Sequence, residues 1–185
     1  MRFLARLMAC SVLAAVSQVQ AAPTGAPPEV ATGPVTKLPL PRYASLKTDR
    51  VNLREGPSKD HRTLWVFQRA GLPIEIIAEF ETWRRIRDSE GTEGWVLHSL
   101  LSGRRTSIVT AGRGGDKAAA VPLYARADER SGEEARLQAG VIGSVKNCNG
   151  SWCRVIVALP QRGGDVDGYI RQDRLWGVYP NEKVD

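Results

Sequence analysis

The sequence has few of the residues that catalysis and metal binding most often use. Among its 185 residues are only two histidines, His61 and His98, and neither lies in a catalytic signature. The run Gly112-Arg113-Gly114-Gly115 lacks the lysine of a phosphate-binding loop. We therefore expect a protein that is not an enzyme and that binds no metal ion and no cofactor.

The chain also lacks an apolar run long enough to span a bilayer. The apolar run at residues 7–16 is about half of the roughly twenty residues that a spanning helix needs. Arginines precede it, and the small-residue site Val19-Gln20-Ala21 follows it, as in a secretory signal. Residues 1–21 are therefore expected to be a signal peptide, cut after Ala21 or Ala22. The mature protein is expected to be exported, periplasmic or secreted, without a transmembrane segment.

Cysteine is scarce, and the three residues fall into two groups. Cys10 ends Leu7-Met8-Ala9-Cys10, a loose match to a lipoprotein signal, but cleavage there would leave too few residues ahead of it for a normal signal. Cys148 and Cys153 flank Asn149-Gly150, a strong hairpin-turn signal. This spacing puts them on facing strand ends, and in an oxidising periplasm we expect a disulfide. A redox or metal site fits the pair less well, because the spacing is not Cys-x-x-Cys and no histidine or further cysteine lies nearby.

The charge of the chain is mildly basic. The formal net charge is +6, and removal of residues 1–21, which hold two arginines and no acid, leaves +4. Charges of both signs are mixed along the chain, as on a solvated surface. Export argues against nucleic acid as a partner, whereas a weak attraction to anionic envelope polymers stays open.

Proline is concentrated near the N-terminus. Six of the eleven prolines lie between residues 22 and 42, in a stretch without a periodic apolar face. Such a composition favours extended conformations, so we expect residues 22–42 to be a disordered tether; the alternative is a ligand for a proline-binding domain. From Tyr43 onward, short β-type runs alternate with glycine and proline at the spacing typical of small barrels. The best helical candidate, residues 131–139, is only about two turns long, and the alternative for it is a loop.

An internal repeat is the most informative pattern in the chain. Its four elements recur 69 to 74 residues apart: Val51-Asn52-Leu53-Arg54 with Val121-Pro122-Leu123-Tyr124, Ala70-Gly71 with Ala139-Gly140, Glu81-Thr82-Trp83-Arg84-Arg85-Ile86 with Gly150-Ser151-Trp152-Cys153-Arg154-Val155, and Gly94-Trp95-Val96 with Gly168-Tyr169-Ile170. The larger last offset indicates an insertion at residues 159–165. The repeat predicts two domains, at residues 43–110 and 118–180, with a Gly-rich linker at 111–117 and a tail at 181–185.

Three motifs of the first unit, Val51-Asn52-Leu53-Arg54-Glu55-Gly56-Pro57, Trp83 and Gly94-Trp95-Val96, follow one another in a familiar order. They resemble the motifs of bacterial Src-homology-3-like (SH3b) domains from cell-envelope proteins. The second unit departs from this pattern, with Tyr124 in place of the arginine and Tyr169 in place of the last tryptophan. The resemblance implies an all-β chain of two tandem small SH3-like β-barrels. The large aromatic side chains suit domains of about 65 residues, whose cores are small.

Aromatic residues and one arginine within the repeated motifs form the candidate ligand-binding set. The six residues are Arg54, Trp83, Trp95, Tyr124, Trp152 and Tyr169. Such side chains can hold a peptide or sugar chain by stacking and charge-assisted hydrogen bonds; the alternative is that the rings form the core. Trp65 and Trp176 lie outside the repeat and are candidates for exposed contacts or for packing between the domains.

The resemblance implies a non-catalytic periplasmic or cell-envelope protein whose SH3-like domains recognise peptidoglycan or an envelope peptide. The alternative is a periplasmic adaptor or scaffold that does not bind the wall, in which two tethered domains gain avidity for one protein partner. Cosedimentation with purified sacculi distinguishes these two hypotheses.

Overall fold

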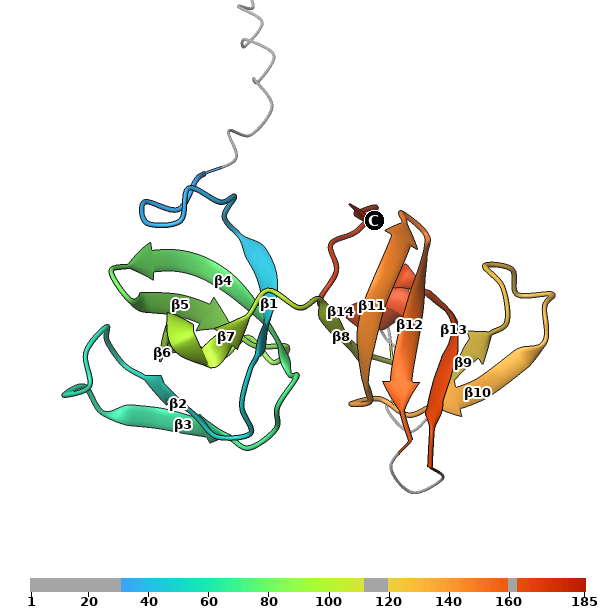
Figure 1. The fold of residues 1–185 in the computed structure, drawn as a ribbon, viewed down its shortest axis with the longest axis horizontal. Coiled ribbons are helices and arrows are strands. Elements are labelled where there is room, and N and C mark those ends of the chain that lie inside the picture. The colour runs from blue at the N-terminus through green and yellow to red at the C-terminus, as the bar shows by residue number, and fades with distance from the viewer. Residues whose placement is uncertain (1–30, 112–119, 160–162) are drawn as a thin grey trace, which may run out of the picture.

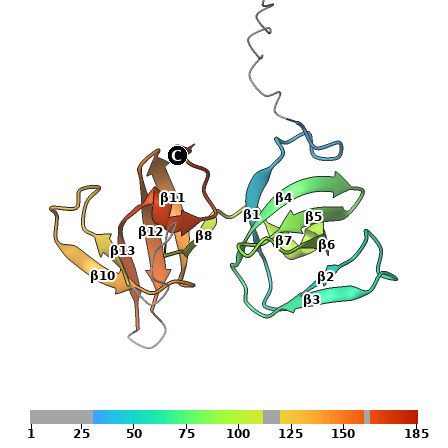
Figure 2. The same ribbon diagram turned by 180° about the vertical axis from the view of Figure 1, so that it is seen from behind.

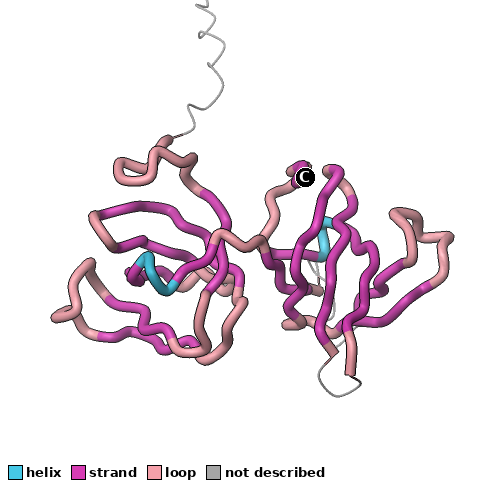
Figure 3. The backbone as a smooth tube through the Cα atoms, viewed as in Figure 1, coloured by secondary structure: helices cyan, strands magenta, loops and turns pink. Residues whose placement is uncertain are grey.

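The described part of the chain is almost entirely β-structure (Figure 1). The computed structural model describes residues 31–111, 120–159 and 163–185. The predicted signal peptide, residues 1–21, lies outside them. The helices within the described residues are two short 3-10 turns, η1 (His98–Leu100) and η2 (Gln172–Arg174) (Figure 3). No helix in this part of the chain is long and apolar enough to cross a membrane. The prediction of an all-β fold is confirmed.

Seven strands of the first domain form one curved antiparallel sheet. They are β1 (Arg42–Leu46), β2 (Val51–Arg54), β3 (Thr63–Phe67), β4 (Pro73–Phe80), β5 (Trp83–Arg87), β6 (Glu93–Leu97) and β7 (Leu101–Ser102). Their order in the sheet is β3-β2-β6-β5-β4-β1-β7. The buried core includes Leu46, Val51, Leu53, Ile74, Ile86 and Val96. Because side chains alternate between the faces of a strand, Asn52 and Arg54 lie on the outer face of β2.

The second domain repeats this topology. Its strands are β8 (Thr106–Val109), β9 (Val121–Tyr124), β10 (Glu133–Leu137), β11 (Ile142–Asn149), β12 (Trp152–Ala158), β13 (Asp165–Arg171), β14 (Leu175–Trp176) and β15 (Lys183–Val184). The order β10-β9-β13-β12-β11-β8-β14 matches that of the first sheet, with every number seven higher. The internal repeat read from the sequence therefore corresponds to two copies of one fold, which lie side by side (Figures 1 and 2).

The boundary between the domains differs from the prediction. Strand β8 was placed in the first domain, 43–110, but it pairs with β11 and β14 of the second sheet. It is the counterpart of β1, so the two sheets join at residues 103–105. Of the predicted linker, 111–117, residues 112–117 lie outside the described residues, and the segment falls between β8 and β9, within the second domain. The sequence misplaced this strand because β1 and β8 share no motif that the repeat could align.

The predicted tether at residues 22–42 is folded in the part that the structure describes, residues 31–42. Residues 22–30 lie outside the described residues, but from residue 31 the chain makes a turn that packs on β4, and β1 begins at Arg42. The Glu79 carboxylate accepts hydrogen bonds from Val35 N (3.1 Å), from Thr36 N and Oγ1 (2.9 and 2.6 Å) and from Arg42 (2.7 Å). A buried carboxylate requires such partners, and this requirement orders a segment whose composition favours disorder.

Two further expectations are wrong at the C-terminal side. The helical candidate at residues 131–139 is strand β10, which pairs with β9. In it, Ala135 and Leu137 are covered while Glu134 and Arg136 are exposed, which is the period of a strand. The tail at residues 181–185 contains β15, which pairs with β11. Both segments form strands because their backbone N–H and C=O groups pair with those of a neighbouring strand, β9 for the first segment and β11 for the second.

The predicted disulfide is confirmed. Cys148 and Cys153 lie opposite each other on β11 and β12, with their Cα atoms 4.1 Å apart and their sulfur atoms bonded. Asn149-Gly150 forms the turn between them, with Gly150 at a φ of 98°. The insertion expected at residues 159–165 falls in the neighbouring hairpin, between Ala158 and Asp165, which are the last paired residues of β12 and β13.

Candidate ligand-binding site

A pocket of about 280 Å³ lies on the outer face of the first domain. Its lining residues are Arg50, Asn52, Arg54, Lys59, Trp83, Leu97 and Leu100. Strand β2 and the residue before it supply one wall, the β2–β3 loop supplies Lys59, and β5, β6 and η1 supply the apolar side. The pocket therefore contains Arg54 and Trp83, two of the six residues in the predicted set.

Trp83 forms the apolar base of this pocket. Its side chain is 6% exposed, so it is largely covered, yet it lines the cavity. Leu97 lies directly opposite it on β6. The sequence left open whether the Trp83 ring belongs to the core or to a binding groove. The ring is largely buried against the sheet, and its remaining surface lines the pocket.

Arg54 is fixed in place by the loop that follows it. Its Nη1 atom donates to the carbonyl oxygens of Lys59 (2.9 Å) and His61 (2.7 Å). The His61 ring packs against Gly56, at a spot where a Cβ atom would clash. Arg54 therefore holds the β2–β3 loop closed and sets the position of Lys59 beside it.

The pocket is positively charged. Among its described lining residues are three cations and no acid. Within residues 31–111, 120–159 and 163–185, no ion pair includes Arg50, Arg54 or Lys59. Such a concave surface with cations of one sign attracts anions.

The remaining predicted residue of the first domain, Trp95, lies on the same outer face but outside the pocket lining. It pairs with Arg85 on β5 and with Arg54 on β2, and it is half-buried. Because Trp95 and Leu97 are two residues apart on β6, they share a face, and Trp95 extends the site along the sheet.

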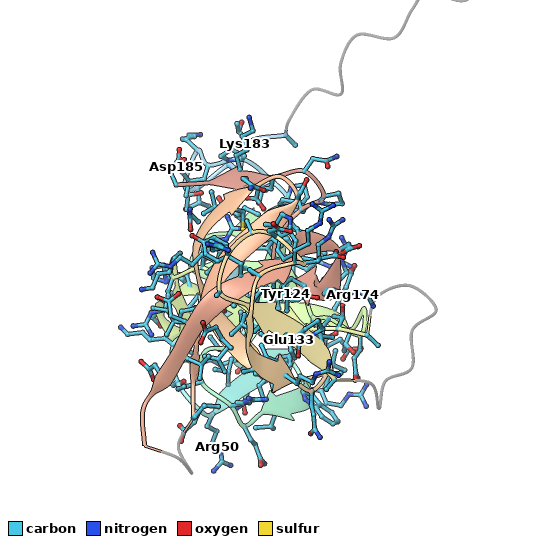
Figure 4. All side chains as sticks on the ribbon, turned by 90° about the vertical axis from the view of Figure 1, so that its right-hand side faces the viewer. Arg50, Tyr124, Glu133, Arg174, Lys183 and Asp185 are labelled. Carbon is cyan, nitrogen blue, oxygen red and sulfur yellow. A yellow bond between two sulfur atoms is a disulfide. The ribbon has the colours of Figure 1, made fainter. Side chains whose placement is uncertain are left out.

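The three predicted residues of the second domain also lie near one another, in a different arrangement. Tyr124 meets Trp152 edge-on, with ring centroids 5.6 Å apart, and Tyr169 pairs with Tyr124 across the strands. The Arg171 guanidinium lies over the Trp152 ring, 5.5 Å from its centroid. Figure 4 shows Tyr124 beside its cross-strand neighbour Glu133. The tryptophan that lines a pocket in the first domain is thus covered by the chain's own arginine in the second.

Comparisons with known families agree with this architecture. A family model described as "Bacterial SH3 domain" matches residues 47–103 and 117–177. The chain belongs to the bacterial SH3 domain family. It contains two tandem copies, one for each sheet, so the resemblance read from the sequence is confirmed.

Two solved structures are similar to the tandem SH3 chain. NlpC1 from Trichomonas vaginalis matches with a TM-score of 0.32 and 13% sequence identity, over 78% of this chain and 48% of that one. NlpC2 from the same organism matches with a TM-score of 0.31 and 13% identity, over 74% of this chain and 48% of that one. The chain spans about half the length of each. No curated protein matches the sequence.

Five pocket residues were missed in the sequence: Arg50, Asn52, Lys59, Leu97 and Leu100. The alternation of β2 and β6 carries a signal for two of them, because Asn52 and Leu97 flank the buried Leu53 and Val96. No comparable signal marks Lys59, whose place depends on how the β2–β3 loop folds onto Arg54.

The other two tryptophans of the SH3 chain lie where the sequence suggested. Trp65, on β3, is 59% exposed. Trp176 packs edge-on against Tyr43 of the first domain, with ring centroids 5.1 Å apart. Trp65 is therefore available for a surface contact, and Trp176 packs between the two domains. Among the described residues, no cluster of three or more His, Cys, Asp and Glu side chains is placed to hold a metal ion.

Proposed function

We propose that the protein is a non-catalytic, exported binding protein of the bacterial cell envelope, which recognises peptidoglycan or an envelope peptide through the pocket of its first SH3 domain. The observation that carries this proposal is the pocket itself, in which a tryptophan and two leucines face three cations. A surface of this kind can hold a chain segment by stacking and charge-assisted hydrogen bonds.

Two features support the other parts of the proposal. The Cys148–Cys153 disulfide is typical of proteins that fold in an oxidising compartment, which favours export. The described lining of the pocket contains no histidine, cysteine, serine or carboxylate, the side chains that most often act as nucleophile or general base. Such a lining is suited to binding.

The experiment is cosedimentation of the mature chain with purified sacculi. We expect saturable binding that is lost in Asn52→Trp, because an indole on this outward-facing position would fill the pocket. Gln68→Trp is the matched control, since it replaces an amide by the same ring at an exposed position after β3 and outside the pocket. Absence of binding by the wild-type chain would overturn recognition of the wall.

A second candidate function, a periplasmic adaptor without wall binding, is favoured by one observation. Leu64 and Trp65 are both exposed on β3, which ends the seven-stranded sheet. An apolar pair on a sheet edge is a common docking place for an extended segment of another protein. In-cell crosslinking of the wild-type chain and of Trp65→Ala tests it: a discrete crosslinked partner that the variant loses would support the adaptor, and an unchanged pattern would oppose it.

A further inference from the structure

We propose that the pocket of the first SH3 domain selects a ligand with a free carboxylate beside a short apolar group. This inference rests on the proposed function, because it names the ligand chemistry of the same pocket. It starts from the three cations that line the cavity, Arg50, Arg54 and Lys59. They come from three places in the chain, namely the residue before β2, the end of β2 and the β2–β3 loop, and the fold brings them to one cavity.

Arg54 is held in a form suited to a carboxylate. Both of its hydrogen bonds use Nη1, so within the described residues Nη2 and Nε have no partner. A guanidinium that is already oriented loses less entropy when it binds, and its planar fork matches the two oxygens of a carboxylate. The loop contact therefore prepares Arg54 for an anionic ligand.

The other arginines on the strands of this sheet are arranged differently. Arg42 and Arg84 pair with Glu79, Arg87 pairs with Glu75, and Arg85 pairs with Glu93. The unpaired arginines and lysine that line the cavity thus contrast with a sheet whose other arginines have carboxylate partners. A ligand carboxylate would give the pocket the same kind of partner that Arg42, Arg84, Arg85 and Arg87 have on the strands of this sheet.

The other side of the cavity limits the rest of the ligand. Trp83, Leu97 and Leu100 form an apolar wall. The volume of about 280 Å³ lies just below the range of roughly 300 to 1,000 Å³ that whole drug-sized ligands occupy. The pocket therefore fits the end of a chain or a short side chain next to its carboxylate, and a longer ligand would continue over Trp95.

The second domain does not share this chemistry. Tyr124 replaces Arg54, Glu129 stands in the loop where the first domain has Lys59, and Arg171 replaces Leu97 over the tryptophan. The carboxylate preference is consequently assigned to the first domain alone. The tandem then presents two different surfaces, and only the first binds the anionic group.

Two sources carry this ligand chemistry in a bacterial envelope. The peptide stems of peptidoglycan carry free carboxylates next to small aliphatic side chains, and the C-terminus of an envelope protein carries a single one. The experiment uses both. Native sacculi are compared with sacculi whose carboxylates have been converted to amides, and the dipeptide Ala-Ala is compared with Ala-Ala amide by the NMR shift of the Trp83 indole N–H.

The expected result is binding to native sacculi that weakens about tenfold to a hundredfold on amidation, the effect of losing hydrogen bonds between charged groups. Arg50→Glu with Lys59→Glu should weaken binding to a similar degree. Both side chains are exposed, so the fold should persist. Arg126→Glu with Arg130→Glu is the matched control, because it makes the same charge change at exposed positions of the second domain and should leave binding unchanged.

The outcomes separate this inference from the proposed function. Equal binding to native and amidated sacculi would overturn the carboxylate preference and leave wall recognition standing. A second outcome is that neither kind of sacculus binds, while Ala-Ala shifts the Trp83 signal and its amide does not. This outcome would support the carboxylate preference and identify the C-terminus of an envelope protein as the ligand. If neither sacculus binding nor a Trp83 shift is observed, both the proposed function and the carboxylate preference would be overturned.

Discussion

The Tyr179 hydroxyl donates a 2.9 Å hydrogen bond to Glu75 Oε1, and this bond joins the C-terminal segment of the second SH3 domain to strand β4 of the first. Arg87 donates to the other carboxylate oxygen, Oε2, with distances of 3.0 and 2.7 Å. Burial, together with the hydrogen bond to Glu75, raises the pKa of Tyr179, so the hydroxyl stays protonated and remains a donor at physiological pH. The Tyr179 ring also packs on Tyr43, with centroids 4.5 Å apart.

The segment that carries Tyr179 is held from the side of the second domain as well. Arg105 donates to both carboxylate oxygens of Glu182 and to the Gly177 carbonyl. Gln172 Nε2 donates to the carbonyl oxygens of Tyr179 (2.6 Å) and Glu182 (3.1 Å). The two SH3 domains are therefore connected by an interface of hydrogen bonds and ring contacts, in addition to the short segment of chain between β7 and β8.

Replacement of Tyr179 by phenylalanine should loosen this interface. The change leaves Glu75, a buried carboxylate, with one partner fewer, so we expect a loss of about 1 to 3 kcal/mol in the free energy of unfolding. Urea unfolding measures this loss, and residual dipolar couplings report the orientation of the domains. Tyr169→Phe is the control, since within the described residues the Tyr169 hydroxyl has no hydrogen-bond partner. Equal effects of the two changes would contradict the role given to the Tyr179 bond.

Reduction of the Cys148–Cys153 disulfide should lower the melting temperature. The bridge closes a short loop, and the loss of its constraint on the unfolded chain amounts to about 2 kcal/mol. Cys148 also pairs with Val184 of β15, so the same change reaches the segment that contacts the first domain. Calorimetry with and without reductant makes the measurement. In a Cys148→Ser, Cys153→Ser variant the reductant should have no effect; a shift there would point to another cause.

Protonation of Glu79 should release the folded segment at residues 31–41. Burial by itself raises the pKa of Glu79, but hydrogen bonds from Thr36, Arg42 and Val35 outweigh it and lower the pKa to about 2. A carboxyl whose folded pKa lies below its unfolded value of about 4.5 stabilises the fold above that value. This contribution, about 3 kcal/mol, should disappear as the pH falls from about 4.5 to 2.

The comparison of wild type with Glu79→Gln tests this pH dependence. The difference in unfolding free energy should be largest at neutral pH and should shrink at pH 2, where the wild-type carboxylate gains its proton. Glu81→Gln, at an exposed position in the turn between β4 and β5, two residues further along the chain, should show no such difference. A Glu79→Gln penalty that stays constant with pH would contradict the ionised state assigned here.

The two tryptophans Trp83 and Trp65 should differ sharply in their effect on stability. Trp83 is 6% exposed, and its replacement by alanine should cost about 3 to 5 kcal/mol. Trp65 is 59% exposed, and the same replacement should change stability by less than about 0.5 kcal/mol. Urea unfolding of both variants checks this. A large loss in Trp65→Ala would mean that the ring supports the fold, and it would weaken the docking role considered for β3.

Much of the fold was readable because its signals are local. The repeat of Val51-Asn52-Leu53-Arg54 in Val121-Pro122-Leu123-Tyr124 identified two equal units, and the hairpin turn at Asn149-Gly150 located the disulfide. Strand β8 was misplaced because its partners, β11 and β14, lie far along the chain and its own residues repeat nothing. Residues 31–41 were expected to be disordered because the carboxylate that orders them, Glu79, is some forty residues away.

The candidate site was readable to a smaller extent. Arg54 and Trp83 belong to repeated motifs and do meet in the pocket. Tyr124 and Trp152 occupy the same motif positions, but there the two rings pack edge-on and Arg171 lies over Trp152. A motif position determines which strand and face a side chain occupies. Its neighbours from other strands and loops determine whether it lines a cavity or is covered.

The sequence by itself determined the family, the number of domains, the strand period and the disulfide, because each depends on residues that are close in the chain or repeated along it. Only the tertiary structure decided where one domain ends, that Glu79 orders the segment before β1, and that Tyr179 of one domain meets Glu75 of the other. It also decided that Lys59 joins Arg50 and Arg54 around one cavity. These relations depend on contacts between distant segments, whose geometry exists only once the sheets have closed around their cores.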